Sequence, residues 1–398
     1  MKRFVLILIC SWLTLAVYGQ TSFYNFESTH YRVNSDLSQA HAVTVANKME
    51  AALKLFNDLC HFDPTQLNTK LKVTVFNKKA GFDEYLTRIL EKTRENFVYI
   101  HYSDLRKSEM VGFNKESEEE FNASLLHQGF IQFLKAFIPN PPIWMREGIA
   151  TSFEASVYDP VKQSFTYRPN YAWLDTLKAI LNGTLPGRPV ITSAALLTGD
   201  RETVGQQIEA FYPQAWGLLM FLQNSEKREY NRILWDSFSA LDPEKSLKDN
   251  SISVMKYAFG WYDEPRMMKD YTSYIFSIKT FNDLVTEGIN LYTIEDMDKA
   301  NQSFMRALTL EPQNYIPYYY LGLIAYAKNE YIQAEGYYKA ALALGADSAL
   351  TKYALGVNAF ADNRFDVATN YLKEAKTGDP SKYTEKVDSL LQRIESLR

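Results

Sequence analysis

The stretch from Leu125 to Glu154 holds the residues whose types and spacing come closest to a known chemistry. A hydrolytic zinc site needs two histidines four residues apart on one helix, a glutamate beside the first as general base, and a third ligand from elsewhere. His127 and Glu147 stand at the first and third ligand positions. Gln128 stands at the general-base position and Ile131 at the second ligand position. Because an amide cannot take a proton from water and isoleucine has no lone pair, we expect no catalytic residue here.

The residues around these positions resemble the gluzincin zinc peptidases, specifically the bacterial peptidase-MA-like group, whose pattern is HEGFHQFL followed by PPxWxxEGxAxxFE. The resemblance implies an α+β metallopeptidase-like domain, with His127 and Glu147 as vestigial zinc-ligand positions and Ile131 at a lost ligand position. No cofactor is expected, because two ligands make a weak zinc site. The matching positions outside the chemistry are Gly129, Phe130, Gln132, Phe133, Leu134, Pro142, Trp144, Gly148, Ala150, Phe153 and Glu154.

Three interpretations of His127 remain open. Phe130, Ile131 and Leu134 share its helix face, as in a core helix, which favours a structural histidine bonded to Glu147. Alternatively, His127 belongs to a catalytic zinc site with an unorthodox ligand set, or it holds a weak regulatory metal. The geometry that the resemblance implies predicts that His127 and Glu147 face each other within hydrogen-bonding distance, with Ile131 beside them.

Residues 1–19 have the features of a secretory signal: Lys2 and Arg3, an apolar stretch, and a small residue, Gly19, at the expected cleavage site. The apolar stretch is short for a membrane anchor, the alternative interpretation. We therefore expect an exported protein, located in the periplasm, in the cell envelope or outside the cell. Cleavage removes Cys10 and leaves Cys60 as the only thiol, so no internal disulfide is possible.

The composition predicts a globular protein with more than one domain. The 398 residues are 46% hydrophobic and 14% aromatic, enough for a large core. The formal net charge is −4, and no basic patch of the kind that binds nucleic acid is present. No stable membrane span is expected in the mature chain. We therefore expect a protein or polypeptide partner and no nucleic acid.

Residues 20–275 are predicted to form the α+β domain, because strand-like and helix-like periods alternate in them. The segment Tyr167–Asp200 is rich in turn signals and is predicted to be rich in loops. Strands are predicted near 30–33, 70–76, 97–102 and 110–113, and helices over 38–60, 122–137, 144–155, 211–222, 227–240 and 251–258.

Residues 281–382 form three gapless repeats of 34 residues. Position 8 of each repeat is glycine and positions 20 and 27 are alanine. This pattern resembles the tetratricopeptide repeat (TPR), in which small residues let two antiparallel helices approach closely. The resemblance predicts an all-α solenoid, capped by an amphipathic helix over residues 383–398. The repeat glycines and alanines are Gly288, Gly322, Gly356, Ala300, Ala334, Ala368, Ala307, Ala341 and Ala375.

In the TPR fold, five positions of each repeat line a concave groove. In this sequence they are mainly apolar and aromatic, which favours a polypeptide partner with apolar anchors. Alternatively, this surface docks onto the chain's own N-terminal domain. We expect the boundary between the domains to lie between about Tyr262 and Thr280. The groove residues include Tyr292, Tyr319, Leu323, Tyr326, Tyr353 and Phe360.

Two functions are compatible with these features. The one we favour is an exported binding or scaffold protein, with an inactive zinc-peptidase-like domain and a TPR module for protein–protein interaction. The alternative is an active zinc metallopeptidase with an unorthodox ligand set. The resemblance predicts a fold, whereas only the site residues can support an activity.

Overall fold

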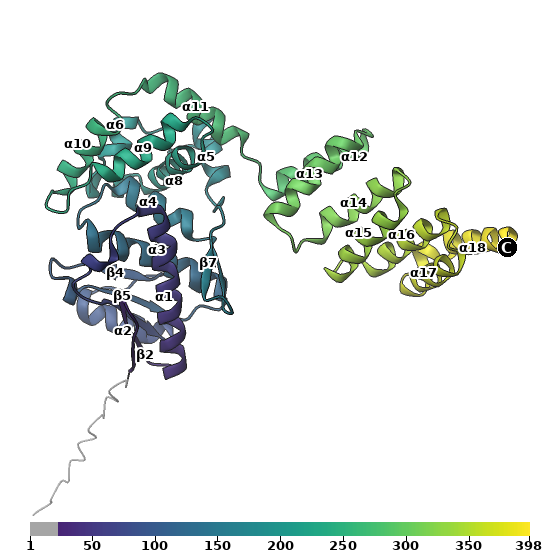
Figure 1. Cartoon of the computed structure of the whole chain (residues 1–398), viewed down its shortest axis with the longest axis horizontal. Coiled ribbons are helices and arrows are strands. Elements are labelled where there is room, and N and C mark those ends of the chain that lie inside the picture. Colours follow the sequence, from purple (N-terminus) through teal and green to yellow (C-terminus); the bar gives the residue numbers. More distant parts are fainter. Residues whose placement is uncertain (1–22) are drawn as a thin grey trace, which may run out of the picture. The chain divides into compact units, whose positions relative to one another are not determined.

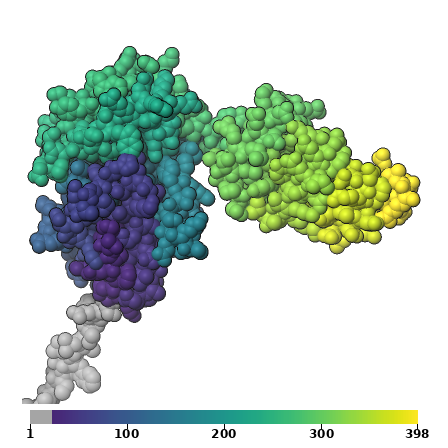
Figure 2. Space-filling view, viewed as in Figure 1, coloured from purple at the N-terminus to yellow at the C-terminus, as the bar shows by residue number. Residues whose placement is uncertain are grey.

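The computed structural model describes residues 23–398, so the signal sequence predicted over residues 1–19, with Cys10, lies outside the described part. The chain divides into two compact units between Ile275 and Phe276. One unit combines a sheet with helices, and the other consists of helices alone (Figure 1). Figure 2 shows one face of each unit with all its atoms, coloured by residue number. No helix among the described residues is long and apolar enough to cross a membrane.

A mixed five-stranded sheet forms the base of the first unit. Its order is β1-β2-β3-β5-β4, with β2, β3 and β5 parallel and the two outer strands antiparallel to their neighbours. Strand β4 is therefore an edge strand, next to the strand that leads into the helix of His127. The strands are β1 (Tyr24–Glu27), β2 (Tyr31–Ser35), β3 (Leu71–Phe76), β4 (Val98–Ile100) and β5 (Glu109–Phe113).

Helices cover both faces of this sheet. Helix α1 (Gln39–Cys60) begins after Ser38, whose side chain accepts a hydrogen bond from the backbone N–H of His41 at 3.1 Å. It lies beside α3 (Glu118–Phe137) (Figure 1). Helix α2 (Lys79–Leu90), which the periodicity did not reveal, packs on the opposite face. Strand β3 is therefore buried on both faces rather than on one.

Helix α4 (Ile143–Phe153) lies at the centre of the unit. Ten of its eleven residues are buried, since it packs between α3 and α8 (Ile208–Asn224). Gly148 makes the crossing with α8 possible, because a Cβ there would lie 2.7 Å from the backbone carbonyl oxygen of Ala215. Two helices that approach this closely hold their side chains in fixed positions.

Two segments of the unit combine irregular chain with helices. The turn-rich segment Tyr167–Asp200 contains α5 (Leu174–Leu181), an amphipathic helix with a buried apolar face, and α6 (Ser193–Thr198), and the rest of it is irregular. The range given for the domain boundary contains α11 (Glu264–Ser277), which buries Met267, Tyr271 and Ile275. The remaining elements of the unit are η1 (Pro64–Gln66), η2 (Leu105–Lys107), β6 (Val157–Asp159), β7 (Ser164–Thr166), α7 (Arg201–Gln206), α9 (Arg228–Ser239) and α10 (Leu247–Tyr257).

The second unit is a TPR-like array of three helix pairs followed by a final helix. The glycine at position 8 of each repeat faces a large side chain of the pair's second helix: Phe304, Tyr338 or Leu372. A Cβ at any of these glycines would overlap that side chain, which explains the pattern. The helices are α12 (Phe281–Thr293), α13 (Met297–Leu310), α14 (Tyr315–Ala327), α15 (Tyr331–Ala343), α16 (Ser348–Ala361), α17 (Phe365–Gly378) and α18 (Pro380–Leu397).

Candidate functional site

His127 and Glu147 meet where α3 packs against α4. The distance from His127 Nε2 to Glu147 Oε2 is 3.4 Å, so the predicted approach of the two side chains is confirmed. The Glu147 side chain is only 6% exposed, and Ile131, one turn after His127, is also buried. The packing of α3 against α4 thus places two ionisable groups in a largely apolar space.

A third residue, Glu154, completes this cluster. Its Oε1 lies 2.7 Å from Nδ1 of His127, closer than Glu147 lies to the other ring nitrogen. Glu154 Oε2 in turn accepts a hydrogen bond from the side-chain amide of Asn170 at 2.9 Å. Glu154 stands at a matching position of the family pattern, but the resemblance implies no role for it. The available signal was its spacing: seven residues after Glu147, and so on the same helix face.

The charges within the cluster stabilise one another. Burial lowers the pKa of His127, but the carboxylates of Glu147 and Glu154 outweigh this effect and raise it to about 9. Burial raises the pKa of Glu147, but His127 and Arg146 outweigh it and bring the pKa to about 2. Arg146 Nε donates to Glu147 Oε1 at 2.7 Å. The two glutamates thus favour the protonated form of the His127 ring at neutral pH.

Gln128 has a structural partner of its own. Its Oε1 accepts a hydrogen bond from the backbone N–H of Tyr99, in edge strand β4, at 3.1 Å. The amide thus ties α3 to the edge of the sheet at the position where a general base would stand. Burial, followed by the charge of Glu147, raises the pKa of Tyr212 to about 12, so its hydroxyl is neutral near the cluster.

A pocket of about 290 Å³ opens beside His127. Polar groups line it together with one aromatic ring, so it is suited to a polar ligand group or a short segment of chain. The lining residues are Asn96, Phe97, Ala123, Ser124, His127, Gln128 and Glu154.

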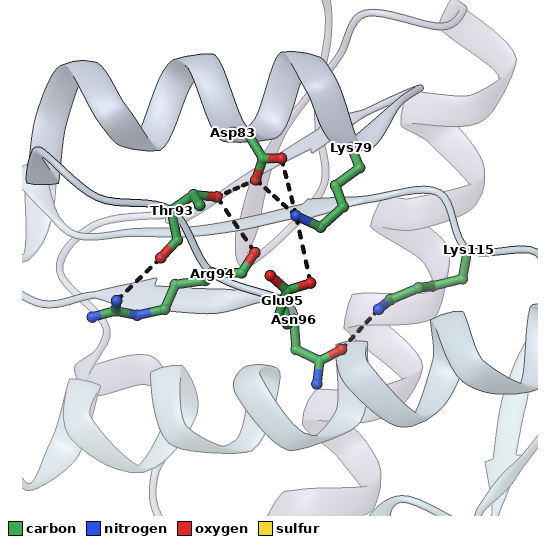
Figure 3. A network of polar contacts seen from close by, with 7 residues as sticks. All are labelled: Lys79, Asp83, Thr93, Arg94, Glu95, Asn96 and Lys115. Atoms are coloured by element: carbon green, nitrogen blue, oxygen red, sulfur yellow. Dashed lines mark hydrogen bonds and ion pairs between the residues drawn. The ribbon is translucent and has the colours of Figure 1, made fainter.

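The loop that supplies Asn96 to this pocket is held by a polar network (Figure 3). Asp83 of α2 accepts hydrogen bonds from Thr93 and from Lys79. Lys79 also lies 3.6 Å from Glu95, and Lys115 donates to Asn96 Oδ1 at 2.7 Å. The loop is thus bonded to α2 on one side and to the segment after β5 on the other. These bonds hold this wall of the pocket in place.

The three side chains of the cluster do not converge on one point. The two nitrogens of an imidazole point in opposite directions, so Glu147 and Glu154 lie at opposite edges of the His127 ring. One ion cannot contact a ring nitrogen and both carboxylates in that arrangement. Across residues 23–398, no group of three or more His, Cys, Asp or Glu is placed to hold a metal.

Comparison with known proteins gives a weak likeness to a solved repeat structure. No protein-family model matches the sequence, and no curated protein matches it. The chain is similar to a solved structure described as the first TPR of Spaghetti (RPAP3) bound to the HSP90 peptide SRMEEVD, with 15% identity and a TM-score of 0.28. The similarity covers 30% of this chain and 92% of that one. A likeness of this degree says nothing about what this chain binds.

The predicted groove residues of the repeats are all half-buried. Their rings pack against neighbouring rings: Tyr353, for example, stacks on Tyr383 with ring centroids 5.0 Å apart, and Tyr319 lies 5.8 Å from Tyr338. The same holds for Tyr292, Tyr326 and Phe360, whereas Leu323 packs on the cluster around Tyr338. These side chains thus support the helix pairs and keep part of their surface exposed.

Proposed function

We propose that this chain is an exported binding or scaffold protein, whose first unit keeps a gluzincin-like frame without peptidase chemistry and whose repeats recruit a protein partner. The observation that carries the proposal is the position of His127, whose ring nitrogens lie 3.4 Å from Glu147 and 2.7 Å from Glu154. Both ring nitrogens therefore have partners within the protein itself.

The surroundings of His127 support a non-catalytic role. A peptidase of the resembling family needs a general base next to the first histidine, and its loss costs a factor of ~10² to 10⁴ in rate. The oxygen of Gln128 is already bonded to the backbone of Tyr99. The pocket beside His127 remains open and polar, so we infer that this unit binds a polypeptide segment there without cutting it.

The repeats supply the second binding surface of this proposal. Their half-buried tyrosines offer apolar contact area with a hydroxyl at the tip, which suits an amphipathic peptide with apolar anchors. No Lys or Arg stands among the six groove residues, so recognition of a terminal carboxylate is not proposed.

Restoring the missing zinc residues tests the lost-site proposal. The double substitution Gln128→Glu with Ile131→His returns the general base and places a second imidazole one turn after His127. We expect this variant to bind zinc stoichiometrically, and the parent protein not to, when both are dialysed against zinc and then measured for metal content. Adding His127→Ala to the double variant is the matched control and should abolish the binding. Zinc binding by the parent that is lost in His127→Ala alone would overturn the proposal.

An active zinc peptidase is the second candidate, and one observation favours it. A metal-binding histidine usually donates a hydrogen bond from its other ring N–H to a carboxylate. Glu154 lies in such a position, 2.7 Å from Nδ1 of His127. Under this hypothesis the purified mature chain retains stoichiometric zinc through dialysis and cleaves an unfolded protein such as reduced casein. A strong chelator that removes the zinc abolishes this activity. If Glu147→Gln cleaves as fast as the parent, a contaminating protease is responsible and this second candidate fails.

A further inference from the structure

A second hollow lies away from His127, between α9 and α10. Its volume is about 570 Å³. Its walls come from the exposed face of α9, the loop after it, and Tyr257 at the end of α10. We call it the α9–α10 hollow, and it is lined by Arg232, Asp236, Ser239, Ala240, Leu241, Asp242, Pro243, Lys245 and Tyr257.

Exposed aromatic rings stand at this hollow. Tyr257, in its wall, is 60% exposed and Trp261 is 48% exposed. The guanidinium of Arg232, another wall residue, lies 5.6 Å from the centre of the Trp261 ring, so Trp261 borders the hollow. Exposing such rings costs free energy, and their gathering around one hollow points to a ligand.

The charged groups of the hollow balance one another. Arg232 Nε donates to Asp236 at 3.3 Å, and Lys245 Nζ lies 3.8 Å from Asp242. Two cations and two anions give no net charge, which disfavours a polyanion such as nucleic acid. The same groups supply both donors and acceptors for a neutral ligand with many hydroxyl groups.

A buried asparagine holds the loop after α9 in place. Asn250, which is fully buried, accepts a hydrogen bond from the backbone N–H of Asp242 and donates to its backbone carbonyl, both at 3.0 Å. The same Asn250 amide also donates to the carbonyl of Asn140. The loop after α9 is thus fixed in advance, which lowers the entropy cost of binding.

The turn that carries Trp261 depends on a glycine. A Cβ at Gly260 would clash with the carbonyl oxygen of Lys256, so only glycine fits there. The chain therefore turns sharply at the end of α10 and brings Trp261 to Arg232 of α9. Trp261 is exposed because the tight turn places it there.

From the exposed rings, the balanced charges and the fixed loop after α9, we propose that the α9–α10 hollow binds a neutral oligosaccharide. The C–H face of a pyranose ring packs against an exposed aromatic ring, while the sugar hydroxyls bond to the side chains of Asp236 and Arg232. This site is independent of the function proposed for His127, from which it is separate in the fold.

Calorimetric titration of the mature chain with three hexasaccharides, of β-1,4-glucose, α-1,4-glucose and β-1,4-N-acetylglucosamine, tests this proposal. We expect at least one of them to bind at millimolar concentration or below. Trp261→Ala and Tyr257→Ala should each weaken that binding at least about tenfold, which corresponds to ~1.4 kcal/mol. Trp261→Phe, which keeps an aromatic ring, should retain most of it.

Tyr24→Ala is the matched control, because Tyr24 is an exposed aromatic residue of strand β1 in the same unit, 44% exposed. Its binding should equal that of the parent. Absence of binding by all three sugars overturns the proposal, as does parental affinity in both Trp261→Ala and Tyr257→Ala. Equal loss in the control and the variants would place the sugar elsewhere and also overturn it. Circular dichroism of each variant confirms that it is folded.

Discussion

At the scale of single residues, two carboxylates raise the pKa of His127. Glu147 lies in α4 and Glu154 directly follows its last residue, and the two contact opposite edges of the His127 ring. Each carboxylate also has a second donor, Arg146 for Glu147 and Asn170 for Glu154. A buried charge is tolerated only when it is paired in this way, so the cluster is kept together by its own electrostatics.

The stability of the first unit should therefore depend on His127 in a pH-specific way. The folded pKa of His127, about 9, exceeds the ordinary value of 6.5, so its contribution is complete below about pH 6.5 and is lost as the pH rises through 9. The folded pKa of Glu147, about 2, lies below the ordinary 4.5, so its contribution is complete above pH 4.5 and is lost as the pH falls through 2. Both contributions are complete between pH 4.5 and 6.5.

We expect His127→Gln to lower the free energy of unfolding most within this window, progressively less between pH 6.5 and 9, and little above pH 9. Breaking a buried ion pair costs ~3 to 5 kcal/mol, and because His127 is 19% exposed we expect the lower end of that range or somewhat less. Urea denaturation at pH 6 and at pH 9.5 measures the difference. His61→Gln, which removes an exposed imidazole, is the control. A cost that is equal at both pH values would contradict the ion-pair account.

At the scale of elements, small residues decide how closely helices pack. In the second repeat, a Cβ at Gly322 of α14 would lie 2.5 Å from the ring of Tyr338 in α15. Tyr338 is fully buried and cannot move aside. Gly336, also in α15, has nothing within 4 Å of the position its Cβ would take. Two glycines of one repeat therefore have opposite structural roles.

Gly322→Ala should destabilise the repeat unit by ~1 to 3 kcal/mol, because the added methyl group overpacks a filled interface. Gly336→Ala should stabilise it by up to ~1 kcal/mol, because alanine favours a helix and meets no obstacle. Thermal unfolding followed by circular dichroism would show opposite shifts of the transition of the repeats. A higher transition temperature in both variants would mean that helix propensity outweighs the contact with Tyr338. A lower one in both would contradict the prediction for Gly336.

At the scale of the whole molecule, the two compact units are joined by a very short connection. Helix α11 ends at Ser277 and α12 begins at Phe281, so only residues 278–280 lie outside helices. These residues lie within the range given for the domain boundary from the sequence, about Tyr262 to Thr280. Since α11 buries three side chains in the first unit, it belongs to that unit rather than to the connection.

Brief digestion with trypsin should therefore cut after Lys279 before it cuts elsewhere in the described chain, because exposed loops are cleaved more readily than helices. Two stable fragments are expected, and mass spectrometry identifies their ends. Lys279→Gln removes the cleavage site and should keep the chain intact under the same conditions. Earlier cutting inside α11 or inside a repeat would show that the division between Ile275 and Phe276 is not the weakest point.

The second unit was predictable in detail from the sequence because its contacts are local. Each helix pair joins residues of one 34-residue repeat, so the glycine at position 8 and its partner side chain recur in register. The helix of His127 was also predictable, since its periodicity is strong. Its approach to Glu147 was expected only through the resemblance to a known family.

Other features depended on tertiary structure. Glu154 reaches His127 from 27 residues away, and its role required the actual crossing of α3 and α4. The α9–α10 hollow requires a tight turn at Gly260 and a loop fixed by Asn250. Sequence periodicity determines which face of an element is buried, because it reflects local geometry. Which buried faces meet, and which polar groups then become partners, is decided by packing between distant segments, for which the sequence carries no local signal.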